Sequence, residues 1–407
     1  MELGQILSSL RRNKAAVALI TLQIAVTLAV LCNGLFIIQQ QTRLSRSPSG
    51  VQDEAGVFII TNQWVGSSSD GAAREQSDLA ALRGLPQVED ATVSVDHPLG
   101  GAFMGEGITV NPSDPKSGAF TMVYPVDGHA IHTLGLKLIA GRNFRPEEVV
   151  VRNGFGQPAA SLAGAIVTEA VARQLAPDGK VLGRIATMIP DGTRVPIIGI
   201  VERLQSTPLA GDAPLAAQSI LLPYLWSDSQ IFYIVRAKPG QFASATTAAR
   251  NALYGISRDR IVIGIQSFAE ARRDAYRSAR GVALIMGVIS AILLSVTAFG
   301  IFGLTNYWVS QRTRYIGIRR ALGATRGTIL RYFQSEILLI TVVGSILGVS
   351  LALAANFWML RSIALTRLPP TFLIVGVIGV FALGQLAVLW PALRGSWISP
   401  ALATRSV

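Results

Sequence analysis

The sequence predicts a membrane protein with four transmembrane α-helices and a large α/β extracytoplasmic domain of two lobes, inserted between helices 1 and 2. Three observations support this fold class. Half of the 407 residues are hydrophobic and only 15% are charged, against about 25% in a typical soluble domain. Four long windows contain no Asp, Glu, Lys or Arg. Most basic residues outside the insert lie in the segments that these windows would place on one side of a membrane.

The four uncharged windows are each long enough to cross a bilayer. An α-helix needs roughly 20 residues to cross about 30 Å of hydrocarbon. Basic residues precede the first window, as they do in a signal peptide. However, the apolar run of a signal peptide is about 7–15 residues long and this window is longer, so we interpret it as an anchor. The windows are 15–38, 281–309, 337–360 and 372–393.

The distribution of charge predicts the orientation. Residues 43–277 contain 22 basic and 22 acidic residues, which leaves 14 basic and 2 acidic residues elsewhere. Eleven of those 14 lie before the first window, between the second and third, or after the fourth. The positive-inside rule therefore places both termini in the cytoplasm. The net charge of +12 reflects this topology, so no nucleic-acid partner is expected.

These observations divide the chain into nine segments. In order, they are a cytoplasmic N-terminal segment (1–14), transmembrane helix 1 with its stalk (15–42), the extracytoplasmic domain (43–279, with a stalk helix from 267), transmembrane helix 2 (280–309), a cytoplasmic segment (310–334), transmembrane helix 3 (335–360), an outer loop (361–371), transmembrane helix 4 (372–393) and a cytoplasmic tail (394–407).

The extracytoplasmic domain is expected to mix strands and helices. Runs rich in β-branched and aromatic residues predict strands at 57–61, 91–95, 120–126, 195–201, 219–225 and 232–237. Apolar residues at helical spacing predict helices at 75–85, 168–176 and 242–256. Segments rich in Ser, Gly, Pro, Asp and Ala predict loops at 47–56, 66–74 and 206–217.

A capping box predicts where the chain turns back toward the membrane. In the sequence SFAE, Ser267 is the expected N-cap and Glu270 the N3 residue. No proline occurs between residues 241 and 368, so one helix is expected to run from Ser267 to about Trp308 without a break. We interpret it as a rigid stalk.

Two common catalytic motifs are missing from the sequence. It contains neither a G-x-x-x-x-G-K-[ST] phosphate loop nor a G-x-S-x-G nucleophile elbow, so we expect a non-catalytic chain without a bound cofactor. The histidines are His97, His129 and His132. The last two have the spacing of metal ligands, but with no nearby cysteine or carboxylate pair we expect a lobe surface rather than a zinc site. The single cysteine, Cys32, offers no disulfide.

The four windows also lack the ionisable groups that ion-coupled carriers place inside the membrane. Their strongest polar residues are amides, which we expect to form interhelical hydrogen bonds. The energy for any transport is therefore expected to come from a partner. The amides are Gln23, Asn33, Asn306, Asn356 and Gln385.

The stretch QRTRYIGIRRALGATRGTILRYF, residues 311–333, contains six arginines and no acidic residue. The second transmembrane helix is expected to end near Leu322, Gly323 and Ala324 to form a turn, and Thr325 to cap the next helix. Glu336 is a candidate partner for one arginine.

The apolar residues of this stretch are candidates for a protein contact. Ile316, Ile318 and Leu322 are expected to be exposed and to enter a groove on a partner, whose acidic rim would face the arginines. A second interpretation is that the arginines only set the topology and bind anionic lipid headgroups.

The same stretch resembles the segment between the second and third helices of FtsX-like permeases of ABC transporters. In the outer domain, four runs resemble the periplasmic core domain of the MacB-type, macrolide-exporter branch, and a fifth resembles the C-terminal end of the family. The runs are HTLGLKLIAGRNF (132–144), AIVTEAVARQLAPDGKVLGRIATM (165–188), VPIIGIVERL (195–204), ILLPY (220–224) and PALRGSWISPALATR (391–405).

The resemblance implies a multi-pass permease subunit in a bacterial inner membrane that works by mechanotransmission. In this mechanism, ATP-driven closure of a separate ABC ATPase subunit, which binds ATP and Mg, moves the outer domain to expel cargo. Further implied partners are a second permease copy or paralogue, a periplasmic adaptor, an outer-membrane channel and membrane lipids. The implied ATPase-coupling residues are Ile316, Gly317, Ile318, Arg319, Arg320, Ala321, Leu322, Gly323, Ala324 and Thr325.

Two features depart from the family pattern. Tyr315 stands where relatives often carry a glutamate before the Ile-Gly pair, and the ATPase domain of fused exporters does not precede the first helix, which implies a separate subunit. Two other functions stay open: a lipoprotein-releasing permease, and a transmembrane regulator of a peptidoglycan hydrolase.

Overall fold

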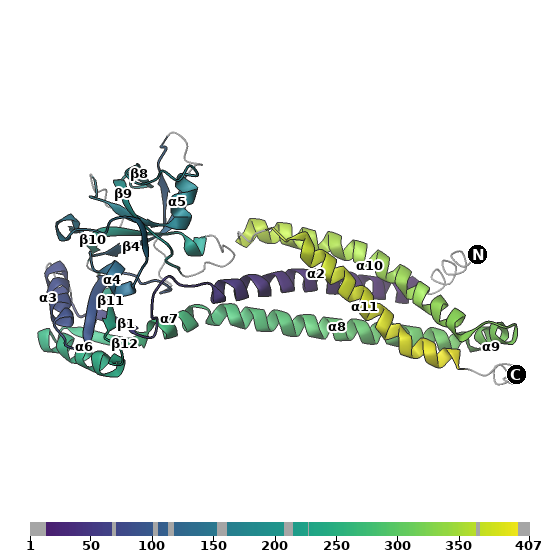
Figure 1. Ribbon diagram of the computed structural model, residues 1–407. Coiled ribbons are helices and arrows are strands. Elements are labelled where there is room, and N and C mark those ends of the chain that lie inside the picture. Colours follow the sequence, from purple (N-terminus) through teal and green to yellow (C-terminus); the bar gives the residue numbers. More distant parts are fainter. Residues whose placement is uncertain are drawn as a thin grey trace. The chain divides into compact units, whose positions relative to one another are not determined.

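The computed structural model describes residues 14–66, 71–100, 105–112, 118–152, 161–206, 215–226, 228–363 and 367–397 (Figure 1). The chain divides into a helical unit, Met1–Arg43 with Ala279–Val407, and an α/β unit, Leu44–Ser278. Most of the predicted N-terminal segment and the residues after 397 lie outside the described residues.

Long apolar helices build the helical unit. Four helices in the described part of the chain are long and apolar enough to cross a membrane, and each contains one of the predicted windows. A short helix, α9, lies between the second and third of them in sequence. The helices are α2 (Lys14–Arg46), α8 (Arg277–Gln311), α9 (Thr313–Ala321), α10 (Arg326–Ile363) and α11 (Pro370–Ser396).

Two glycines bring α10 close to α2. A Cβ atom added at Gly344 would lie 2.7 Å from Cγ2 of Ile24, and one added at Gly348 would lie 2.9 Å from Cβ of Leu28. Their spacing of four residues puts both glycines on one face of α10. Lipid provides little hydrophobic drive for helix association, so close packing of small residues is what stabilises this contact.

Polar groups within the apolar helices behave differently from one another. Asn33 donates from Nδ2 to the carbonyl of Ala352 at 3.2 Å, which confirms an interhelical hydrogen bond for this residue. In the described part of the chain, the Nε2 atoms of Gln23 and Gln385 are buried without a hydrogen-bond partner, so the expectation is wrong for these two.

The first sheet of the α/β unit has four antiparallel strands in the order β12-β1-β11-β2. Helices α3 and α6 follow β1 and β11, which gives the split β-α-β arrangement twice. Leu79 and Leu82 from α3 and Leu253 from α6 pack on this sheet. The elements are β1 (Val57–Trp64), α3 (Gly71–Arg83), β2 (Val88–Ser94), β11 (Gln230–Ala237), α6 (Phe242–Ile256) and β12 (Arg260–Ser267).

A buried ion pair fixes the edge strand β12 to α3. The guanidinium of Arg260 donates to both carboxylate oxygens of Asp78, at 2.7 and 2.8 Å, and neither side chain is exposed. Tyr233 donates to the same carboxylate, and the ring of Trp64 lies 4.3 Å from the guanidinium. The bidentate geometry and the aromatic contact compensate for the desolvation of both charges.

The second sheet closes on itself. Its strands follow the order β4-β3-β8-β9-β7-β10, and a parallel pairing between β10 and β4 joins the ends, while β6 pairs with β10 and β5 with β9. Closure removes the unpaired edges of six strands. The strands are β3 (Gly105–Thr109), β4 (Ala119–Val126), β5 (Leu138–Gly141), β6 (Val150–Arg152), β7 (Ala165–Thr168), β8 (Ile185–Ile189), β9 (Arg194–Val201) and β10 (Ser219–Trp226).

Short helices complete this part of the unit. They are α4 (Ala130–Leu134) and α5 (Glu169–Leu175), with single 3-10 turns at Pro146–Glu148 and Leu215–Ala217. The six predicted strands and three predicted helices are all present within about two to four residues at their ends. The predicted loop at 66–74 is wrong at its end, because α3 begins at Gly71.

The predicted stalk helix begins where the capping box placed it but is not continuous. Ser267 accepts from the backbone N–H of Glu270 at 3.1 Å, and Glu270 accepts from that of Ser267 at 2.8 Å. Helix α7 (Phe268–Ala275) then ends at Tyr276, and α8 starts one residue later. The expectation of an unbroken helix is wrong here, because the buried Tyr276 leaves helical geometry and its hydroxyl pairs with Gln205 at 2.6 Å.

One carboxyl in the closed sheet is buried without full hydrogen bonding. Glu106 on β3 is 6% exposed, and its Oε2 has no hydrogen-bond partner among the described residues. Burial and, to a lesser extent, the charge of Asp191 raise the pKa of Glu106 to about 7, and Arg152 offsets only part of this.

We expect the stability of the protein to fall as the pH rises toward neutrality. Between the ordinary pKa of a glutamate, about 4.3, and about 7, folded Glu106 binds more protons than unfolded Glu106, so the free energy of unfolding decreases with pH. Between about pH 5 and pH 8, the melting temperature should therefore drop more in the wild type than in Glu106→Gln. Equal drops in thermal denaturation would show that Glu106 does not contribute.

Candidate functional site

The arginine-rich stretch folds as a helix, a turn and the start of a second helix. Helix α8 ends at Gln311, Arg312 adopts a non-helical conformation with φ −105° and ψ 16°, and α9 follows. The expectation that α8 would continue to Leu322 is therefore wrong. The helix breaks at Arg312, whose side chain is engaged by α10. Figure 1 shows α9 where α8 and α10 meet.

The turn after α9 has the geometry of a Schellman motif. The N–H of Ala324 donates to the carbonyl of Arg319 at 3.0 Å, and that of Gly323 to the carbonyl of Arg320 at 3.1 Å. Gly323 has φ +97°, a left-handed conformation that glycine adopts without a steric penalty. Thr325 then caps α10, accepting from the N–H of Thr328 at 3.3 Å. The turn predicted at these residues is confirmed.

A buried ion pair holds the start of α9 against α10. Arg312 Nη1 lies 3.1 Å from both carboxylate oxygens of Glu336 and 3.0 Å from the hydroxyl of Tyr332. Glu336 is fully buried, and the side chain of Arg312 is 20% exposed. The predicted role of Glu336 as partner of one arginine is confirmed. The Arg312–Glu336 pair holds the two helices together at this joint, the contact between the start of α9 and α10.

Apolar packing strengthens the same joint. Ile316 is 4% exposed and shares a core with Ile329 and Phe333. The expectation that Ile316 is exposed is therefore wrong: it lies on the face of α9 that meets α10. The guanidinium of Arg319 lies 4.9 Å from the ring centre of Tyr315, so the tyrosine at the position of the family's glutamate makes a cation–π contact one turn away.

The opposite surface of α9 and its C-cap residue present apolar side chains that the described residues leave exposed. Ile318 is 46% exposed and Leu322 is 83% exposed. An exposed apolar patch with a polar rim marks an interaction site, and these two side chains lie one helical turn apart among the arginines of the stretch. Among the ten predicted coupling residues, these two side chains are therefore exposed, whereas Ile316 and Gly317 are buried.

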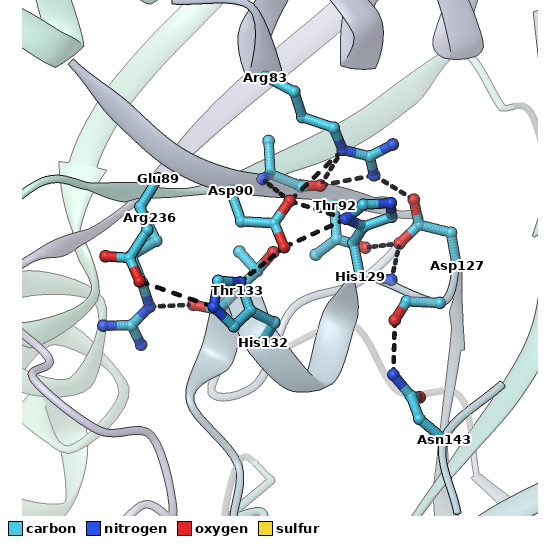
Figure 2. Close-up of polar contacts among 12 residues, drawn as sticks. Arg83, Glu89, Asp90, Thr92, Asp127, His129, His132, Thr133, Asn143 and Arg236 are labelled. Atoms are coloured by element: carbon cyan, nitrogen blue, oxygen red, sulfur yellow. Dashed lines mark hydrogen bonds and ion pairs between the residues drawn. The ribbon is translucent and has the colours of Figure 1, made fainter. Parts of the chain in front are cut away.

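A second polar site lies inside the α/β unit, where the four-stranded sheet meets the end of β4 (Figure 2). Asp90 on β2 lies 2.9 Å from Nδ1 of His129 and 2.8 Å from Nδ1 of His132. Asp127, directly after β4, accepts from Arg83 of α3 and from Thr92 Oγ1. We call Arg83, Asp90, Asp127, His129 and His132 the Asp90 cluster.

The Asp90 cluster adds carboxylates to the expectation about the histidines. The sequence showed no carboxylate pair near them, yet Asp90 lies within hydrogen-bond distance of both rings, and Glu89 lies 3.6 Å from His132. Both histidine side chains are partly exposed, as expected for a lobe surface. Among the described residues, no group of three or more His, Cys, Asp or Glu side chains is arranged to hold a metal ion. Sequence reasoning missed this site because its members are brought together only by the pairing of distant strands.

Comparison with known families decides what kind of protein this is. Residues 15–253 match the MacB-like periplasmic core domain, and residues 287–400 match the FtsX-like permease C-terminal domain. The first match alone covers more than half of the chain. The chain belongs to the MacB-type, FtsX-like family of ABC transporter permeases.

The permease is similar to proteins named as exporters and permeases. It is 24% identical over 318 residues, 75% of this chain, to the macrolide export ATP-binding/permease protein MacB of Chromobacterium violaceum. It is 29% identical over 222 residues, 52% of this chain, to the pyoverdine export ATP-binding/permease protein PvdT of Pseudomonas savastanoi pv. phaseolicola. It spans 45% and 33% of the lengths of these relatives.

Two further comparisons concern a permease of similar length and a solved structure. The permease is 24% identical over 378 residues, 88% of this chain and 84% of the other, to the uncharacterized ABC transporter permease YvrN of Bacillus subtilis. The periplasmic region of MacB from Actinobacillus actinomycetemcomitans matches 57% of this chain and 97% of its own, with 13% identity and a TM-score of 0.34.

We expect Arg312→Gln to destabilise the helical unit more than Arg314→Gln. The first change leaves Glu336 buried without its cation, which costs about 3–5 kcal/mol. The second removes an exposed charge, and such changes usually stay within about 0.5 kcal/mol. Heating purified protein in detergent, followed by size-exclusion chromatography, would measure both midpoints.

The double variant Arg312→Gln/Glu336→Gln serves as the control for this prediction. It removes both charges and should recover much of the lost stability, since two amides no longer leave a buried charge unpaired. Equal midpoints for the two single variants would contradict the assignment of the ion pair.

Proposed function

We propose that the permease is a subunit of a MacB-type ABC efflux transporter of a bacterial inner membrane and works by mechanotransmission. In this proposal a separate ATPase subunit, which binds ATP and Mg, docks on α9. The observation that carries the proposal is the combination of two exposed apolar side chains, Ile318 and Leu322, with a buried ion pair behind them, Arg312–Glu336.

This combination suits the transfer of a push from a partner. Apolar side chains that enter a groove supply binding free energy because they leave water. A helix that yielded at its joint would absorb the partner's movement rather than pass it on. The ion pair, the core around Ile316 and the Schellman turn each oppose such yielding.

The proposed topology has four transmembrane helices, a two-lobed outer domain between helices 1 and 2, and both termini in the cytoplasm. Its support is the charge distribution, with 11 of 14 basic residues outside the insert on one side. The exposed Arg314, Arg326 and Arg331 then face cytosol and the headgroups of anionic lipids.

The proposed partners follow the names of the relatives. MacB and PvdT are named for macrolide and pyoverdine export, which favours export over lipoprotein release or hydrolase regulation. We propose a dimer with a second permease copy or paralogue, together with a periplasmic adaptor and an outer-membrane channel. The chain itself is proposed to be non-catalytic.

Replacing Ile318 or Leu322 with Asp should uncouple the permease from its ATPase. Each change places a carboxylate in the apolar contact, and burying an unpaired charge costs several kcal/mol. The variants should reach the membrane at wild-type levels, because all six arginines remain and acidic residues count little for orientation. Co-purification of the ATPase and cargo transport, measured at matched membrane levels, test this.

Thr328→Asp is the matched control. It adds the same charge to an exposed position in the first turn of α10, where a carboxylate favours the helix, and it should couple normally. Wild-type coupling in Ile318→Asp and Leu322→Asp would remove α9 as the docking element.

Thiol labelling tests the topology. Cys32 is the only cysteine and is buried, so a single introduced cysteine reports its own position. In spheroplasts, an impermeant maleimide should label a cysteine at the exposed Ser244 of α6 and spare one at the exposed Thr328. The reverse pattern would invert the orientation and refute a cytoplasmic α9.

A further inference from the structure

A cavity of about 300 Å³ lies in the α/β unit beside the Asp90 cluster. Three parts of the chain line it: helix α3, the residues directly after β4, and the segment around the 3-10 turn Pro146–Glu148, with Leu225 of β10. Its volume lies at the lower end of the range of about 300–1,000 Å³ that small-molecule sites occupy. Such sites favour junctions between structural layers, as here.

One side of the cavity is apolar and held in place. Leu79, Phe144 and Leu225 contribute buried side chains. In the same segment, Arg142 donates to both carboxylate oxygens of Glu148, at 2.8 and 2.6 Å. The hydrogen bonds from Arg142 and from the backbone of Arg145 lower the pKa of Glu148 to about 2, so this wall keeps its ion pair at neutral pH.

The other side offers a hydrogen-bond donor and an acceptor. Arg83 uses Nε and Nη2 for the carbonyl of Ala91 and for Asp127, and Nη1 has no partner among the described residues. His129 uses Nδ1 for Asp90, and its Nε2 has no partner in the described part of the chain. With Nδ1 protonated toward the carboxylate, Nε2 is an acceptor. Figure 2 shows the two side chains next to each other.

The charges around the cavity disfavour a charged ligand. The guanidinium of Arg83 is already shared between Asp90 and Asp127, so a ligand carboxylate would meet a cation that two carboxylates neutralise. Asp127 already accepts from Arg83, Thr92 and the N–H of His129, so an ammonium group would find its oxygens engaged. A neutral group that both accepts and donates fits Nη1 and Nε2 together.

We propose that this cavity binds a small, neutral, amphipathic molecule. Its apolar body lies against Leu79, Phe144 and Leu225, and a hydroxyl or amide group accepts from Arg83 Nη1 and donates to His129 Nε2. The inference goes beyond the proposed function and does not rest on it, because the site lies wholly within the α/β unit.

The test uses the full chain in lipid nanodiscs and 4-phenylbutanamide as the probe. Gln76 lines the cavity from α3, while its neighbour Ser77 is exposed and does not. Millimolar probe should slow alkylation of Gln76→Cys by N-ethylmaleimide several-fold and leave Ser77→Cys unchanged. No slowing, or equal slowing at both positions, would overturn the proposal, the latter because it reports only partition of the probe into lipid.

Two further arms test the cavity and the ligand class. Ala80→Phe, at an exposed position of α3 that lines the cavity, should abolish protection of Gln76→Cys, and Ala243→Phe on α6 should preserve it. Protection that survives Ala80→Phe would place the probe elsewhere. The isosteres 4-phenylbutyrate and 4-phenylbutylammonium should protect less, and equal or better protection by either would refute a neutral ligand.

Discussion

The ion pair between Arg312 and Glu336 is the constraint on which the proposed function of the helical unit depends. A fully buried carboxylate is tolerated only when a cation and hydrogen bonds compensate for its lost hydration, and Arg312 supplies the cation and donates to both carboxylate oxygens. The hydroxyl of Tyr332 accepts from the same guanidinium. To reach Glu336, Arg312 leaves helical geometry and ends α8. The break, in turn, sets α9 as a separate helix, with Ile316 buried against α10 and Leu322 outside.

The α/β unit uses charge in a similar way at its own junctions. Arg260 and Asp78 fix the edge of the four-stranded sheet without any exposure to solvent. The Asp90 cluster joins that sheet to the residues after β4, with Arg83 bridging both carboxylates. Buried pairs of this kind add little net stability but penalise alternative arrangements, since separating them leaves an unpaired charge. We therefore expect the sheets of the α/β unit to move as rigid bodies.

Much of the fold could be predicted from the sequence because its signals are local. Uncharged windows, β-branched runs and the Ser267–Glu270 capping box each depend on neighbouring residues. Strands β3, β5, β6, β7 and β8 were missed because each is only three to five residues long, and β12 was missed although it is longer. The breaks at Tyr276 and Arg312 were missed because their causes, Gln205 and Glu336, act through tertiary contacts.

The sequence predicted where in the chain the candidate coupling site lies, but not which of its side chains face outward. Gly323 and Thr325 carry local signals for a turn and a cap, and both are found in those roles. Which of Ile316, Ile318 and Leu322 faces outward depends on where α9 starts, and this depends on Arg312. The Asp90 cluster had no sequence signal, because Asp90 on β2, Arg83 on α3 and the segment with Asp127 and His129 after β4 are brought together only by the folded sheets.

The central claim is that the outer surface of α9 is the docking surface for an ATPase. Site-specific photo-crosslinking in native membranes tests it directly, with a photoreactive residue at Leu322 and, for comparison, at the buried Ile316. The account predicts that the probe at Leu322 forms an adduct with an ABC ATP-binding subunit, and that the probe at Ile316 links within its own chain. Adducts at Leu322 with lipid alone would contradict the account.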